Sequence, residues 1–99
     1  MNWIWDPEKD RLNQRKHGIA FEMATQVFSD PFAFSEQDRH ENGEERWQTV
    51  GMMSGVTIIL VAHTFPDAES GAELLRIISA RRATPTERKR YEQERLRYL

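Results

Sequence analysis

The sequence predicts one α+β domain, in which two helices precede a run of antiparallel strands and a last helix follows them. The chain has 99 residues, about the length of one domain. Two helical patterns lie near its start, and segments that read as strands joined by turn residues come after them. We expect the order β-α-α-β-β-β-β-α, with an antiparallel meander and both N-terminal helices packed on one face of the sheet.

The first strand and first helix are expected near the N-terminus. Residues 2–5 resemble a short strand that would pair with the meander, since an isolated strand would be unstable. Asp6 can cap a helix that starts at Pro7, because proline tolerates the first helical position. The helix should end at about His17, with Gly18 as the residue that terminates it.

A second, shorter helix is predicted over residues 19–28, where apolar side chains recur at helical spacing. These side chains are Phe21, Ala24, Val27 and Phe28. Phe32 and Phe34 then alternate with smaller residues, as in a half-buried strand. The charged stretch 35–45 contains Asn42-Gly43, a turn signal, and is expected to be a connection rather than a strand.

Three further strands are predicted in the second half. Residues 46–53 alternate in polarity, and Ser54-Gly55 turns the chain into the strand 56–64. That second strand is apolar on both faces, which favours a place at the centre of the sheet. A polar connection at 65–71 leads to the last strand at 73–81.

The last helix has a strong start signal. Thr84 is a suitable cap, Pro85 takes the first helical position, and Glu87 stands three residues after the cap. The helix should extend to the late nineties, but its apolar residues are few. Either a partner covers it, or Tyr91 and Leu96 dock onto the sheet.

Composition excludes several classes of protein. The chain has no cysteine, so it has no disulfide, thiolate metal site or cysteine nucleophile. Its longest apolar run, residues 58–62, is far shorter than the ~20 residues that span a bilayer. The N-terminus lacks the basic and apolar regions of a signal peptide. We therefore expect a cytoplasmic protein with no membrane contact.

Charge is segregated along the chain, which has a net charge of −2. Residues 1–18 are net +1, residues 19–75 are net −8, and residues 76–99 are net +5. Such a chain can present a basic surface to phosphate groups while remaining acidic overall. The alternative is that the basic segment is only a solvated helix surface.

No metal or cofactor pattern is present. The three histidines, His17, His40 and His63, are far apart and have no accompanying ligands at metal-binding spacing. No glycine-rich phosphate loop and no nucleophilic serine motif occur either. We expect neither a metal nor a cofactor.

The arginines near the last strand are the main candidates for function. An arginine within an apolar strand is costly unless it is paired or reaches solvent. Arg76 could therefore close an ion pair with Glu44 or Glu45, or project toward a substrate phosphate. Simple strand alternation places Arg81 on the opposite face from Arg76.

The other candidates have structural alternatives. His17 could be a helix-terminal charge or a catalyst, and His63, at the end of the central strand, has the same two readings. The tryptophans, Trp3, Trp5 and Trp47, could form core or partner contacts or stack on nucleobases.

These residues together resemble the BrnT-type toxins of bacterial type II toxin–antitoxin systems. The resemblance covers about residues 3–92, and its most specific parts are Lys16-His17-Gly18 and Arg76-Ile77-Ile78-Ser79-Ala80-Arg81. Further matching positions are Trp5-Asp6, Lys9, Asn13, Ile19, Asp30-Pro31, Glu45-Arg46, Gly51, His63-Thr64, Glu87-Arg88 and Tyr91.

The resemblance implies a fold similar to RelE-type ribonucleases and metal-independent cleavage of RNA. It also implies a ribbon-helix-helix antitoxin, through which the pair would bind operator DNA and repress its own operon. A second hypothesis is a non-catalytic binding module that acts only as a corepressor with a DNA-binding partner.

The site residues follow from the matched positions and the chemistry of RNA cleavage. That reaction needs a base, an acid and cations that stabilise the charge on the phosphate. Arg76 and Arg81 suit charge stabilisation, with Lys16 assisting, and His17 or His63 could act as base or acid. The residues expected to contact RNA are Arg46, Ser79, Arg82 and Glu87.

Overall fold

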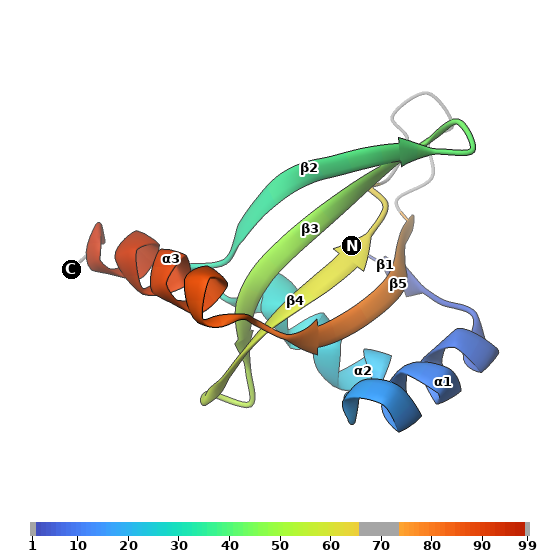
Figure 1. The fold of residues 1–99 in the computed structure, drawn as a ribbon, viewed down its shortest axis with the longest axis horizontal. Coiled ribbons are helices and arrows are strands. Elements are labelled where there is room, and N and C mark those ends of the chain that lie inside the picture. Colours follow the sequence, from blue (N-terminus) through green and yellow to red (C-terminus); the bar gives the residue numbers. More distant parts are fainter. Residues whose placement is uncertain (1, 66–73, 99) are drawn as a thin grey trace.

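A five-stranded mixed sheet forms the centre of the α+β domain in this computed structural model, which describes residues 2–65 and 74–98 (Figure 1). The strands are β1 (Asn2–Ile4), β2 (Phe34–Glu41), β3 (Glu44–Met53), β4 (Thr57–His63) and β5 (Leu74–Arg82). They lie in the order β1-β5-β4-β3-β2, so the apolar strand β4 is central as predicted. Only β1 is parallel to its neighbour, β5. The predicted connection 65–71, apart from Phe65, and the predicted strand start at Glu73 lie outside the described residues.

Helix α1 (Pro7–His17) has the ends that the sequence predicts. The Asp6 carboxylate accepts a hydrogen bond of 2.9 Å from the amide of Glu8. Gly18 is left-handed, with φ 72°, and its amide donates to the Gln14 carbonyl.

Among the described residues, no helix has both the length and the apolar composition that a membrane-spanning segment needs.

The predicted helix 19–28 is shorter than expected. It consists of α2 (Phe21–Ala24) followed by the 3-10 helix η1 (Thr25–Ser29). The Thr25 hydroxyl donates to the Glu22 carbonyl at 2.6 Å, a local bond that competes with regular α-helix geometry. The apolar stripe is nevertheless correct, since Phe21, Ala24 and Val27 are all buried.

The prediction of a connection over residues 35–45 is wrong, because β2 extends from Phe34 to Glu41. Asn42 and Gly43 make the tight turn into β3, with φ values of 54° and 76°. β2 has a neighbour on one side only, and its residues 35–40 are exposed. An edge strand needs few apolar side chains, so its charged sequence concealed it.

Different helices pack against the two faces of the sheet. We call the side packed against α1, α2 and η1 the α1/α2 face; its core includes Ile19, Phe21, Ala24, Val27, Ile59, Val61, Leu75, Ile77 and Ala80. The opposite side, the α3 face, is partly covered by α3 (Pro85–Leu96), and its core is Val50, Leu60 and Tyr91. Figure 1 shows α1 and α3 on opposite sides of the molecule.

Helix α3 docks on the sheet mainly through one side chain. Tyr91 is 1% exposed, and its hydroxyl donates to the Asp30 carboxylate at 2.6 Å. Arg90 forms an ion pair with Glu36 and stacks on the Phe34 ring. Leu96, the other predicted anchor, remains 65% exposed. Docking through Tyr91 therefore holds this polar helix against the sheet in the isolated chain.

Candidate nucleic-acid interface

An irregularity in β5 brings the two predicted arginines to one face of the sheet. Ser79 pairs with Ala62 of β4, but the next β4 residue, His63, pairs with Ile77, so Ile78 is an extra residue. Such a bulge reverses the alternation on one side of it. Leu75, Ile77 and Ala80 accordingly share the α1/α2 core, which leaves Arg76, Ser79 and Arg81 on the α3 face. The expectation from simple alternation, that Arg76 and Arg81 lie on opposite faces, is wrong for this reason.

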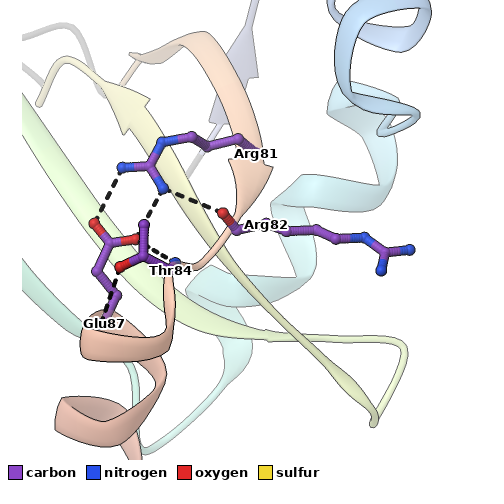
Figure 2. A network of polar contacts seen from close by, with 4 residues as sticks. All are labelled: Arg81, Arg82, Thr84 and Glu87. Atoms are coloured by element: carbon purple, nitrogen blue, oxygen red, sulfur yellow. Dashed lines mark hydrogen bonds and ion pairs between the residues drawn. The ribbon is translucent and has the colours of Figure 1, made fainter.

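Arg81 joins the end of β5 to the start of α3. Its two terminal nitrogens donate to the two carboxylate oxygens of Glu87, at 2.8 and 3.0 Å (Figure 2). One of them also donates to the Arg82 carbonyl at 3.1 Å. Glu87 in turn completes a capping box with Thr84, through bonds of 2.9 and 3.2 Å. Arg81 thus has a fixed direction before any ligand arrives.

The charges of this pair reinforce each other. The hydrogen bond from Arg81 lowers the pKa of Glu87, and the bond to Glu87 raises the pKa of Arg81. Both groups therefore stay ionised at neutral pH. The pair lies at the N-terminus of α3, where a carboxylate also interacts favourably with the helix dipole.

Arg76 forms the ion pair that the sequence offered as one alternative, and its partner is Glu44 rather than Glu45. The Arg76 Nη2 atom lies 2.5 Å from Glu44 Oε1. The two side chains are 42% and 36% exposed, so both remain accessible from solvent. The backbone of Arg76 is fixed separately, since its amide donates to the Thr64 hydroxyl at 3.1 Å.

The α3 face between the two ion pairs is lined by polar and small side chains. Ser79 lies opposite Ala62, which lies opposite Gln48 on β3. Arg46, two residues before Gln48, is half-buried on the same face. Arg39 of β2 stands directly opposite Arg46. Sequence reasoning missed Arg39 because it placed this residue in a connection. Only the alternation of side chains along an edge strand could have indicated that Arg39 lies on this face.

Lys16, His17 and Arg82 do not join this cluster. Lys16 and His17 belong to the last turn of α1, which packs against the other side of β5 through Asn13. Arg82 pairs with Ile59, a residue of the α1/α2 core, and Figure 2 shows its side chain directed away from Arg81. The structure therefore separates the predicted site into two surfaces on opposite sides of the sheet.

His63 is buried on the α1/α2 side and has no exposed surface. Its Nδ1 donates to the Thr64 carbonyl at 2.9 Å, so in the neutral ring Nε2 accepts from the Thr49 hydroxyl, 2.6 Å away. Ser35 continues this chain, 2.7 Å from Thr49. Burial lowers the pKa of His63, although the bond to Thr64 opposes this shift. These contacts favour a neutral imidazole that joins neighbouring strands.

The tryptophans pack against other aromatic rings. Trp3 stacks on Phe28 with ring centroids 5.2 Å apart, and Trp5 meets Phe21 edge-on at 6.2 Å. Trp47 contacts Phe65 at 4.7 Å. These contacts agree with the core alternative.

Within residues 2–65 and 74–98, no group of three or more histidine, aspartate or glutamate side chains is arranged to hold a metal ion.

Comparisons with known proteins concern the family and the fold of the chain. The family model described as "Ribonuclease toxin, BrnT, of type II toxin-antitoxin system" matches residues 5–87. Among solved structures, the chain is similar to the crystal structure of the Brucella abortus ribonuclease toxin BrnT, with a TM-score of 0.61 and 29% sequence identity. That similarity covers 85% of this chain and 97% of the Brucella chain. None of the curated proteins matches.

Proposed function

This chain belongs to the BrnT family of ribonuclease toxins from type II toxin–antitoxin systems, and we propose that it cleaves RNA without a metal ion and thereby inhibits translation and growth. The observation that carries the proposal is the shared placement of Arg76, Ser79 and Arg81 on the α3 face, which the β5 bulge produces. The arrangement of the helices around the sheet is also compatible with the RelE-like fold that the family resemblance implies.

Arginine suits the chemistry of this reaction. Attack of a 2′-hydroxyl on the adjacent phosphate concentrates negative charge on the phosphoryl oxygens, and fixed cationic donors lower the energy of that state. Arg76 and Arg81 project from one strand, and a guanidinium group offers a phosphate several donors in a planar fork. We assign charge stabilisation to both. Ser79, between them, and Arg46, on β3, would bind flanking phosphate or sugar groups.

The remaining predicted residues have different roles in this proposal. Glu87 orients Arg81. Lys16, His17 and Arg82 would contact RNA only where it leaves the α3 face and passes around β5. His63 would maintain the register of β3 and β4 rather than transfer protons to RNA, because its ring is enclosed.

Type II toxins are paired with a protein antitoxin, and we propose that the partner of this chain is a small ribbon-helix-helix protein. The toxin would contact operator DNA only through that antitoxin, and the pair would repress its own operon. An antitoxin that supplies acidic side chains could displace RNA from the arginines of the α3 face. We place the protein in the cytoplasm, where RNA and operator DNA are both present.

Expression of the chain alone in a bacterial host tests this function. We expect growth arrest with loss of RNA, and relief of both when the neighbouring small reading frame is expressed as well. The purified chain should also cut RNA in excess chelator. Normal growth and intact RNA at high soluble expression would contradict the proposal.

One observation favours the second candidate, a non-catalytic corepressor. Arg76 and Arg81 already have carboxylate partners, Glu44 and Glu87, which reduce the positive potential available to RNA. A corepressor would leave growth and RNA unchanged and would still alter the affinity of the antitoxin for operator DNA. A gel-shift titration beside the growth assay separates the two candidates.

A further inference from the structure

The proposed reaction needs a group that takes the proton of the 2′-hydroxyl, and none of the three histidines lies on the α3 face. His17 is on α1, and His63 is enclosed on the α1/α2 side. His40 pairs with Glu45, and strand alternation places the Glu45 side chain on the opposite side of the sheet from the α3 face. The proton acceptor must therefore come from another residue type. Carboxylates are the next most common general bases.

Three described carboxylates pair with arginines around this face, and two of them are occupied by structural bonds. Glu87 uses one oxygen for Arg81 and the Thr84 amide, and the other oxygen for Arg81. Glu36 pairs with Arg90 and so joins α3 to the edge strand. Proton transfer to either would disturb the attachment of α3.

Glu44 is different. It is the first residue of β3, it does not contact α3 in any described bond, and its contact with Arg76 uses Oε1 alone. Oε2 can therefore receive a proton while Oε1 still accepts the hydrogen bond from Arg76. Arg76 faces Glu44 from β5, and Glu41 lies opposite it in the ladder with β2. The side chain of Glu44 is 36% exposed, so a substrate can reach it.

We propose that Glu44 is the general base of RNA cleavage and acts beside Arg76; this inference rests on the proposed ribonuclease function. Glu44 takes the proton of the 2′-hydroxyl, and the 2′-oxygen forms a bond to phosphorus. The bond from phosphorus to the 5′-oxygen breaks, and that oxygen takes a proton from water. The hydroxide that remains takes the proton from Glu44, which restores the carboxylate. The products are a 2′,3′-cyclic phosphate and a 5′-hydroxyl, and Arg76 stabilises the charge on the phosphoryl oxygens meanwhile.

Glu44→Gln tests the proposal, with Glu45→Gln as the matched control on the neighbouring residue. The experiment measures kcat, RNA affinity and the pH profile of the purified full chain on a single-stranded RNA, with end-group analysis of the products. We expect Glu44→Gln to reduce kcat about 10²–10⁴-fold, the usual contribution of a general base. RNA should bind as tightly as before or more tightly, because a competing carboxylate is gone. Glu45→Gln should cleave as the wild type does.

The pH profile separates base catalysis from simple competition for Arg76. Wild-type kcat should fall toward acid pH, whereas the residual rate of Glu44→Gln should lack that fall. Glu44→Asp, which keeps a carboxylate, should recover part of the loss. Unchanged or increased kcat in folded Glu44→Gln would overturn the role of Glu44 and leave the ribonuclease function standing. Absence of cleavage by the wild type would overturn both.

Discussion

Removal of one hydroxyl from Tyr91 should loosen the attachment of α3 to the sheet. In Tyr91→Phe the ring stays in place, but the 2.6 Å bond to Asp30 is lost. A hydrogen bond to a charged acceptor contributes about 1.5–3 kcal/mol. Asp30 keeps the 2.8 Å bond that the Met52 amide donates to the same oxygen, so we expect a loss near the lower limit, about 1.5 kcal/mol. For a domain of this size that corresponds to a fall in Tm of roughly 6–12 °C.

Thermal melts of wild type, Tyr91→Phe and Tyr98→Phe measure this effect. Tyr98 is 71% exposed, so removal of its hydroxyl should change stability by less than about 0.5 kcal/mol. Hydrogen exchange should show faster exchange over residues 85–96 in Tyr91→Phe only. Equal melting temperatures for the two variants would refute the conclusion that Tyr91 holds α3 in the isolated chain.

The same contact predicts a response to alkaline pH. Burial, followed by the bond to Asp30, raises the pKa of Tyr91 in the folded chain. The folded state therefore holds the phenol proton more tightly than the unfolded state does. This contribution is complete below the unfolded pKa of about 10 and is lost as pH rises further. Tyr91→Phe should show a smaller loss of stability above that pH than the wild type.

Two more substitutions test the packing around the site. Gly51→Ala should destabilise by about 1–3 kcal/mol in urea unfolding, because the new Cβ would lie 2.9 Å from the Cβ of Val27; stability equal to wild type would contradict the close approach of η1 to β3. Glu87→Gln preserves the capping box but weakens the pair with Arg81, so it should cost about 1 kcal/mol or less at pH 7. Because the pKa of Glu87 is lowered, this difference is present above the unfolded pKa near 4.3 and should vanish as pH falls. A difference in Tm that persists at pH 2 would contradict it.

Local signals in the sequence were sufficient for both ends of α1 and for the start of α3. Asp6, Pro7 and Gly18 bound α1, and Thr84 with Glu87 starts α3, because caps depend on a few consecutive residues. The central position of β4 also followed from its own composition, since a strand that is apolar on both faces must be covered on both.

Features that depend on a neighbouring strand could not be predicted in this way. The bulge at Ile78 is defined by its pairing with β4, and nothing in the segment itself marks an extra residue. Without it, Arg76 and Arg81 could not share a face. Edge strand β2 was missed for a related reason, because its stability comes from pairing with β3 rather than from apolar side chains.

The candidate site was predicted only in part. The Arg76 ion pair with a glutamate near the start of β3 was one stated alternative. The proposal that this glutamate acts as a base depends on the absence of a histidine from the α3 face. Whether a histidine is near an arginine across the sheet is a tertiary question. For His63 the answer is that the ring is enclosed and bonded to Thr49, on the side away from Arg76.

RNA cleavage by arginine variants in excess chelator is the measurement that tests the proposed site most directly. Wild type should cut single-stranded RNA, and folded Arg76→Ala and Arg81→Ala should each lose about 10²–10³ in rate, as expected when a donor that stabilises developing charge is removed. Arg88→Ala, on the exposed surface of α3, should retain wild-type activity. Circular dichroism and thermal melts establish that each variant is folded. Cleavage at the wild-type rate by folded Arg76→Ala and Arg81→Ala would contradict the assignment of the α3 face as the site of RNA cleavage.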